Sequence, residues 1–170
     1  MQEEDQRVLQ ELIDRGELGT AEYHPKIKAI HEKNNVRIKE IIKGYGWPGI
    51  SAVGKEGSEA AWLIIQHAVL DTKFMNECLS LLREAAHQGE AEGWCLAYLQ
   101  DRVLTMSDKP QIYGTQHDFD ESGIAFPLPM QQPEKVDLLR QEVGLEPLSE
   151  ATKCIQERQN AIMRNREPND

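Results

Sequence analysis

The chain has 170 residues, of which 39% are hydrophobic and 28% are charged. This length and composition fit one soluble globular domain with its own core. Its 29 acidic residues outnumber its 19 basic residues, giving a net charge of −10, which disfavours binding to nucleic acid or to an anionic membrane surface.

Neither targeting nor metal-binding signals stand out in the sequence. No apolar run approaches the roughly 18 residues of a membrane span, and the acidic start MQEEDQR is unlike a signal segment. The three cysteines and the histidines lack the spacing of disulfides or metal sites. We therefore expect a cytoplasmic protein with no bound metal and no cofactor.

The first part of the chain reads as helices. Apolar residues at helical spacing predict a first helix around 8–13, ended by Gly16 and Gly19. A longer helix is expected from Pro25 to Gly44. The segment GWPGISAVGKEG that follows is rich in Gly and Pro and is expected to be a loop.

Three more helices are expected in the middle of the chain. Ser58 can cap the helix EAAWLIIQHAVL, which is apolar nearly all round and should therefore be central and buried. Asp71 is a candidate N-cap for a helix that ends near Gly89. A further helix covers about 94–104.

The pattern changes after these helices. Residues 110–128 are rich in β-formers and turn residues and predict a small β-hairpin, and two helices are then expected from Pro133 and from about Ser149. The predicted fold is a mostly α, single-domain orthogonal helical bundle over residues 1–164. Residues 165–170 should form a frayed tail.

Residues 49–55 match the phosphate-loop pattern G-x-x-x-x-G-K, but the match lacks its context. A phosphate loop follows a buried strand and continues with a Ser or Thr that reaches Mg²⁺. Here a helical segment precedes the match, and Glu56 occupies the hydroxyl position. We do not expect nucleotide binding at this loop.

Two polar residues, Gln66 and His67, interrupt the most apolar helix. Adjacent helical side chains point about 100° apart, so a buried helix cannot place both in water and each needs a partner. They could be a structural glutamine and a satisfied core histidine. Alternatively, Gln66 binds a ligand and His67 acts as a general acid or base.

Two further polar groups follow along the chain. Asp101 and Arg102 lie among apolar residues, where they could form a structural ion pair. Alternatively, Arg102 grips a carboxylate or phosphate and Asp101 orients His67. The segment QIYGTQ supplies neutral hydrogen-bonding groups, among them Gln111, Tyr113 and Gln116, although a polar strand edge is its default interpretation.

The motifs of the chain, taken in order, resemble those of an uncharacterised bacterial family. The shared segments are GWPG, VGKEG, AAWLIIQHA, DRV and QIYGTQ, and the resemblance covers about residues 30–155. It implies a shared fold and a shared polar site, with no activity attached. The chain departs from this pattern at Val69 and His31, where the family pattern suggests Asp.

The resemblance favours a pocket shared by these groups, because its motifs emphasise polar residues and glycines rather than apolar stripes. Catalytic candidates are His67 and Asp101, and the ligand-binding candidates are Trp47, Gln66, Arg102, Gln111, Tyr113 and Gln116. A hydrolase or transferase acting on a small anionic metabolite is one hypothesis. The alternatives are a noncatalytic sensing module and a protein-interaction or structural domain in which these residues form a buried network.

Overall fold

The computed structural model describes residues 2–15 and 24–164. These residues form seven α-helices, one 3₁₀ helix and a two-stranded antiparallel sheet, which confirms the prediction of a mostly α fold with a small hairpin. No helix among them is long and apolar enough to cross a membrane. The predicted helix end at Gly16 and Gly19 and the tail 165–170 lie outside the described residues.

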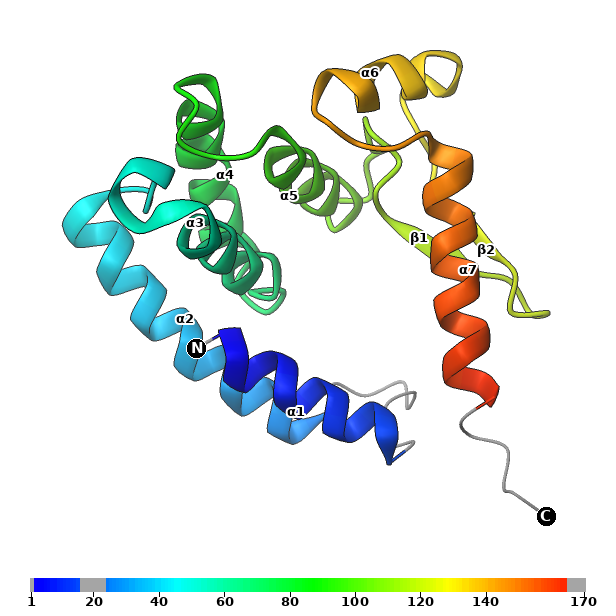
Figure 1. Ribbon diagram of the computed structural model, residues 1–170, viewed down its shortest axis with the longest axis horizontal. Helices are drawn as coiled ribbons and strands as arrows, with labels where there is room; N and C mark the ends of the chain where they lie inside the picture. The colour runs from blue at the N-terminus through cyan, green and yellow to red at the C-terminus, as the bar shows by residue number, and fades with distance from the viewer. Residues whose placement is uncertain (1, 16–23, 165–170) are drawn as a thin grey trace.

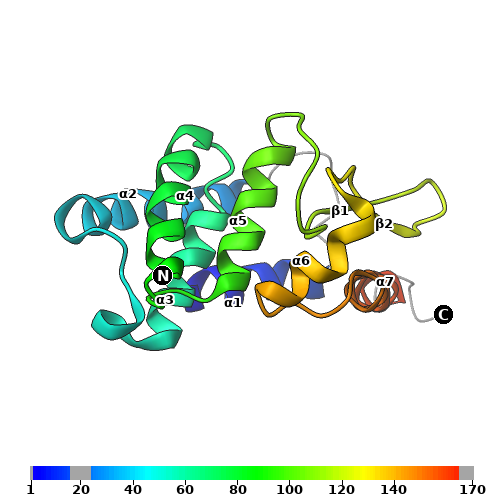
Figure 2. The same ribbon diagram turned by 90° about the horizontal axis from the view of Figure 1, so that it is seen from above.

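The helices and strands form two groups. The first group contains α1 (Gln2–Asp14), α2 (Pro25–Tyr45), α3 (Ile50–Gln66), α4 (Thr72–His87) and α5 (Gly93–Thr105). The second contains β1 (His117–Phe119), β2 (Ala125–Pro127), η1 (Pro133–Lys135), α6 (Val136–Glu142) and α7 (Leu148–Arg164). Figures 1 and 2 show α1 running beside α2, and the hairpin, α6 and α7 lying beyond α5 on the side away from α2.

The core lies between α2, α3, α4 and α5. Ile65, Met75, Leu82 and Leu99 are among its fully buried side chains. Each such side chain stabilises the folded state by roughly 1.5–3 kcal/mol. Helix α3 contacts α1, α2, α4 and α5, as expected for a helix that is apolar nearly all round.

Helix α3 begins earlier than its sequence predicts. It starts at Ile50 and contains a kink at Gly54, whose φ of 75° and ψ of 167° are not helical, so the expectation of a loop up to Ser58 is wrong. The backbone N–H groups of Ile50 and Ser51 donate to Glu90, at 2.9 Å to its carbonyl and 2.8 Å to its carboxylate. Because Glu90 satisfies these groups, α3 needs no cap residue of its own. The Ser51 hydrogen bonds in turn hold the pKa of the Glu90 carboxyl below its usual value.

The ends of α2 and α4 follow the predicted signals. Pro25 occupies the first turn of α2, where its missing N–H costs no helical hydrogen bond. The side chain of Asp71 accepts the backbone N–H of Phe74 at 3.1 Å, which confirms Asp71 as the N-cap of α4. Lys39 of α2 also pairs with this carboxylate, so the same residue joins two helices.

The hairpin is shorter than the predicted range 110–128. Its register pairs His117 with Pro127 and Phe119 with Ala125, and residues 112–116 precede it as a loop. The outer edge of β2 is covered by Gln156 of α7. That side-chain amide accepts the N–H of Ala125 at 2.6 Å and donates to the carbonyl of Gly123 at 2.9 Å.

We predict that Gly114→Ala destabilises the protein by about 2–4 kcal/mol, and more than Gly123→Ala does. Both glycines have positive φ, 67° and 75°, which costs an L side chain free energy. At Gly114 the added Cβ would also lie 2.8 Å from Leu148 Cδ1 and 3.1 Å from Met130 Sδ, whereas nothing lies within 4 Å at Gly123. Urea unfolding followed by circular dichroism measures both losses, and equal losses would contradict this packing.

Candidate functional site

Asp101 shapes the loop that carries the YGTQ residues. It lies in α5 and is 0% exposed. Its carboxylate accepts the backbone N–H groups of Ile112 at 2.7 Å, Tyr113 at 3.1 Å and Thr115 at 3.0 Å, and also the Thr115 hydroxyl at 3.0 Å. Hydrogen bonds to an ionised group are about twice as strong as neutral ones. The described contacts of Asp101 therefore hold the loop, and none of them is to His67.

Gln111 is a second internal support of this loop. Its side chain is 0% exposed. Its amide donates to the carbonyl oxygens of Gln116 and Leu128, both at 2.9 Å, and its Oε1 accepts the N–H of Gln116 at 2.9 Å. One side chain thus satisfies three backbone groups and closes the loop between residues 111 and 116.

Arg140 is the structural residue that sequence reasoning missed. It lies in α6, is 0% exposed, and its guanidinium donates to the carbonyl of Tyr113 at 2.7 Å and to that of Glu146 at 2.6 Å. Arg140 lies four residues after buried Val136, so helical spacing places both side chains on the same face of α6. That spacing was the available signal for a buried arginine.

Arg102 connects the end of α3 to the loop. It is half-buried, and its guanidinium donates to the carbonyl of Gln66 at 2.9 Å and to the side-chain oxygen of Gln116 at 3.2 Å. The amide of Gln116 donates to the Thr115 hydroxyl at 3.0 Å, and that hydroxyl donates to Asp101. One continuous hydrogen-bonded network therefore joins α3, α5 and the loop.

His67 lies next to this network, at the C-cap of α3. Its imidazole is half-buried and stacks on that of His31 from α2, with ring centroids 4.8 Å apart and an interplanar angle of 24°. His31 is 9% exposed. The position at which the family pattern suggests Asp therefore places an imidazole against His67.

Gln66 faces the inside of the protein. Its amide donates to the carbonyl of Tyr98 at 3.4 Å, and the residue is 3% exposed. Its buried Oε1 has no hydrogen-bond partner among the described residues. A buried acceptor of this kind normally pairs with a donor from water or a ligand.

Tyr113 and Trp47 are placed differently from the other candidates. Tyr113 joins the network through its backbone, and burial together with nearby Asp101 raises the pKa of its hydroxyl.

Trp47 lies before the start of α3, where its indole N–H donates to Ser58 Oγ at 3.4 Å. It lines a cavity of about 300 Å³ together with Leu81 and Glu90.

Trp47 contacts the middle of α3. Its hydrogen-bond partner Ser58 lies eight residues before Gln66, roughly 12 Å along the helix, and His67 follows the end of α3. The sequence-predicted residues that the structure joins are Gln66, Asp101, Arg102, Gln111, Tyr113 and Gln116, with His67 adjacent in the chain. The described hydrogen bond of Trp47 goes to Ser58 and not to this network. The described residues contain no group of three or more His, Cys, Asp or Glu side chains that could hold a metal ion.

We predict that Asp101→Asn lowers the free energy of unfolding by about 2–3 kcal/mol. The amide that replaces one carboxylate oxygen would point a donor at backbone N–H groups that now donate to Asp101. Asp118→Asn is a matched control, because Asp118 is exposed and accepts one backbone N–H, that of Phe119 at 2.8 Å. Chemical denaturation of both variants measures the difference. A loss no larger than that of the control would contradict the scaffold role of Asp101.

We also predict that stability falls as the pH drops below about 6.5, the ordinary pKa of histidine, in part through His117. Burial lowers the pKa of His117, as does nearby Arg140, so the unfolded chain binds this proton more readily than the folded protein does. His117→Gln should reduce the dependence of unfolding free energy on pH below this value, by at most about 1.4 kcal/mol per pH unit. An unchanged slope in pH-dependent urea unfolding would contradict the prediction.

Comparison with known proteins identifies the family of this chain. The model of DUF6624, a family of unknown function, matches residues 1–162, and the chain belongs to this family. This confirms the resemblance to an uncharacterised family. No curated protein and no solved structure gives a significant match.

Proposed function

We propose that this member of the DUF6624 family binds a small anionic molecule at Arg102 and Gln116, next to the end of α3 that carries His67. The observation that carries the proposal is the position of Arg102, whose guanidinium bridges Gln66 of α3 and Gln116 of the loop. Polar residues of three motifs, far apart along the chain, are thereby brought into one network.

Exposure divides the network into two layers. Asp101 and Gln111 are 0% exposed and bond to the loop backbone, so they serve as its scaffold. Arg102, Gln116 and His67 are only half-buried, so a molecule from solvent can reach them. This division supports a structural role for the inner layer and ligand contact for the outer layer.

The chemistry of the outer layer suits an anion. Arg102 presents a positive charge in a fixed orientation within a chain of net charge −10, and guanidinium binds carboxylate and phosphate through paired hydrogen bonds. Gln116 and His67 add neutral or titratable hydrogen-bonding groups.

Binding without turnover is the function that these contacts support best. A histidine that transfers protons is usually oriented by a second group. The carboxylate of Asp101, which was the candidate to orient His67, instead accepts the backbone N–H groups of Ile112, Tyr113 and Thr115. We therefore assign Asp101 to the scaffold, and we place hydrolase or transferase chemistry at His67 second.

We predict that Arg102→Gln weakens anion binding by about 10- to 100-fold, since a hydrogen bond to a charged group contributes about 1.5–3 kcal/mol. The probes are inorganic phosphate, citrate and acetate, titrated by isothermal calorimetry at fixed ionic strength. Arg83→Gln is the matched control, because exposed Arg83 also donates to a glutamine, Gln100, at 2.6 Å.

The calorimetry and a separate turnover assay together decide the proposal. Saturable binding that is lost in Arg102→Gln and kept in Arg83→Gln supports the proposal. Equal loss in both variants, or no saturable binding to the wild-type protein, overturns it. A metabolite pool in which the wild-type protein forms products and His67→Ala does not would replace binding with catalysis.

A further inference from the structure

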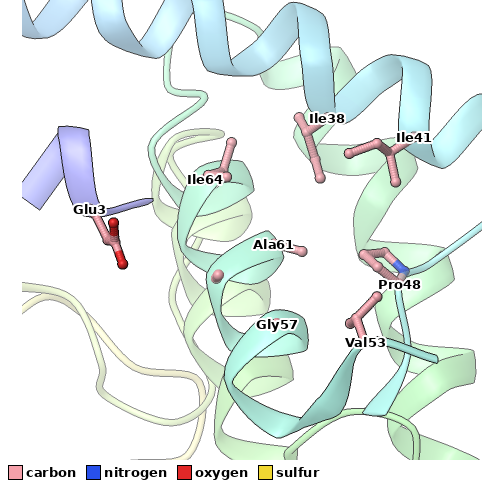
Figure 3. Close-up of a pocket in the computed structure, with 9 residues that line it drawn as sticks. Glu3, Ile38, Ile41, Pro48, Val53, Gly57, Ala61 and Ile64 are labelled. Atoms are coloured by element: carbon pink, nitrogen blue, oxygen red, sulfur yellow. The ribbon is translucent and has the colours of Figure 1, made fainter. Parts of the chain in front are cut away.

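A second cavity, lined by none of the residues of the polar network, lies on the face of α3 that meets α1 and α2. Its volume is about 380 Å³, within the range of roughly 300–1,000 Å³ of small-molecule sites. Apolar residues of α2 and α3 form most of its lining, with Pro48 from the segment before α3; the lining residues include Ile38, Ile41, Val53, Ala61 and Ile64. Figure 3 shows Ile41, Pro48 and Val53 at one end, with the face of α3 extending away from them.

Three of the segments singled out in the sequence line this cavity. Pro48 comes from GWPG, Val53 and Gly57 come from VGKEG, and Ala60 and Ala61 open AAWLIIQHA. Gly57 is needed for its small size, because a Cβ there would lie 2.9 Å from the side chain of Val53. Helical spacing places Gly57, Ala60 and Ile64 on one side of α3, and the small side chains leave the space open.

One charged side chain, Glu3, is among the lining residues. It lies in the first turn of α1, and Figure 3 shows it across α3 from Ile41 and Val53. The next residue, Glu4, pairs with Lys33 of α2 at 2.9 Å, which fixes the start of α1 beside α2. The cavity therefore has an apolar body and a carboxylate at one end.

We propose that this cavity binds a small aliphatic amine, with the alkyl chain over Ala60 and Ala61 and the ammonium group at Glu3. Apolar walls favour an aliphatic body, and the carboxylate favours a cation at that end. A fatty acid of the same length would bring its own carboxylate to Glu3 in a chain of net charge −10, and repulsion disfavours it. This site is independent of the proposed anion site at Arg102.

The test compares three probes that share one alkyl chain: n-octylamine, n-octanol and n-octanoate. Binding to the full-length protein is measured at pH 7 by calorimetry, below the concentration at which the probes form micelles. We expect octylamine to bind at least tenfold more tightly than octanoate, with octanol between them. Shortening the amine by one buried CH₂ should weaken binding by roughly fourfold.

Two variants separate the roles of charge and space. Glu3→Gln should remove the preference for octylamine over octanol and leave octanol binding unchanged. Ala60→Leu, which fills the cavity from a half-exposed position, should weaken binding of all three probes at least tenfold. Ala29→Leu is the matched control, because Ala29 is exposed on the opposite side of α2 from Ile38.

Three outcomes overturn the proposal. The first is an absence of saturable octylamine binding to the wild-type protein. The second is octanoate binding as tight as that of octylamine. The third is unchanged binding in Ala60→Leu, with circular dichroism confirming that this variant is folded.

Discussion

The buried carboxylate of Asp101 is the interaction on which the polar half of the structure depends. A charge removed from water is costly unless hydrogen bonds replace its hydration, and here the donors are backbone N–H groups of residues 112, 113 and 115. To bring all three N–H groups within hydrogen-bonding distance of one carboxylate, the loop has to fold around it. On the other side of the loop, the guanidinium of Arg140 donates a hydrogen bond to the carbonyl of Tyr113. The backbone of Tyr113 thus lies between two charged side chains: its N–H donates to the carboxylate of Asp101, and its carbonyl accepts from the guanidinium of Arg140.

This arrangement explains how one region can be both rigid and accessible. The fully buried Asp101, Gln111 and Arg140 fix the backbone of the loop, so the half-buried Gln116 is held in place for Arg102. Arg102 in turn is fixed at its other contact by the end of α3. Groups that contact a ligand bind it best when their own positions are already fixed. The buried residues fix the positions of Gln116 and Arg102 in this way.

The helices could be predicted because their signals are local. Apolar spacing and the cap at Asp71 are contained within a few residues, and the structure agrees with both. The start of α3 could not be predicted in this way, since its first N–H groups bond to Glu90, about forty residues further along the chain. The Gly and Pro residues of this segment therefore predicted a loop.

The candidate site was predictable in its composition more than in its geometry. Polar residues that interrupt apolar helices pointed to Gln66, Asp101 and Arg102. The structure joins Arg102 to Asp101 through Gln116 and Thr115, whereas Gln66 takes part only through its backbone carbonyl. Sequence spacing does not show which way a side chain turns, so the two predictions for Asp101, an ion pair and an orienting contact to His67, did not include its hydrogen bonds to the loop. Trp47 was also a candidate, and its described hydrogen bond goes to Ser58 of α3 rather than to the network.

The side-chain amide of Gln156 covers the outer edge of the two-stranded sheet. An open strand edge exposes backbone donors and acceptors that can pair with another molecule and start aggregation. By bonding to Ala125 and Gly123, this side chain occupies the positions that an incoming strand would use. Helix α7 thus blocks the outer edge of β2 from pairing with a strand of another molecule.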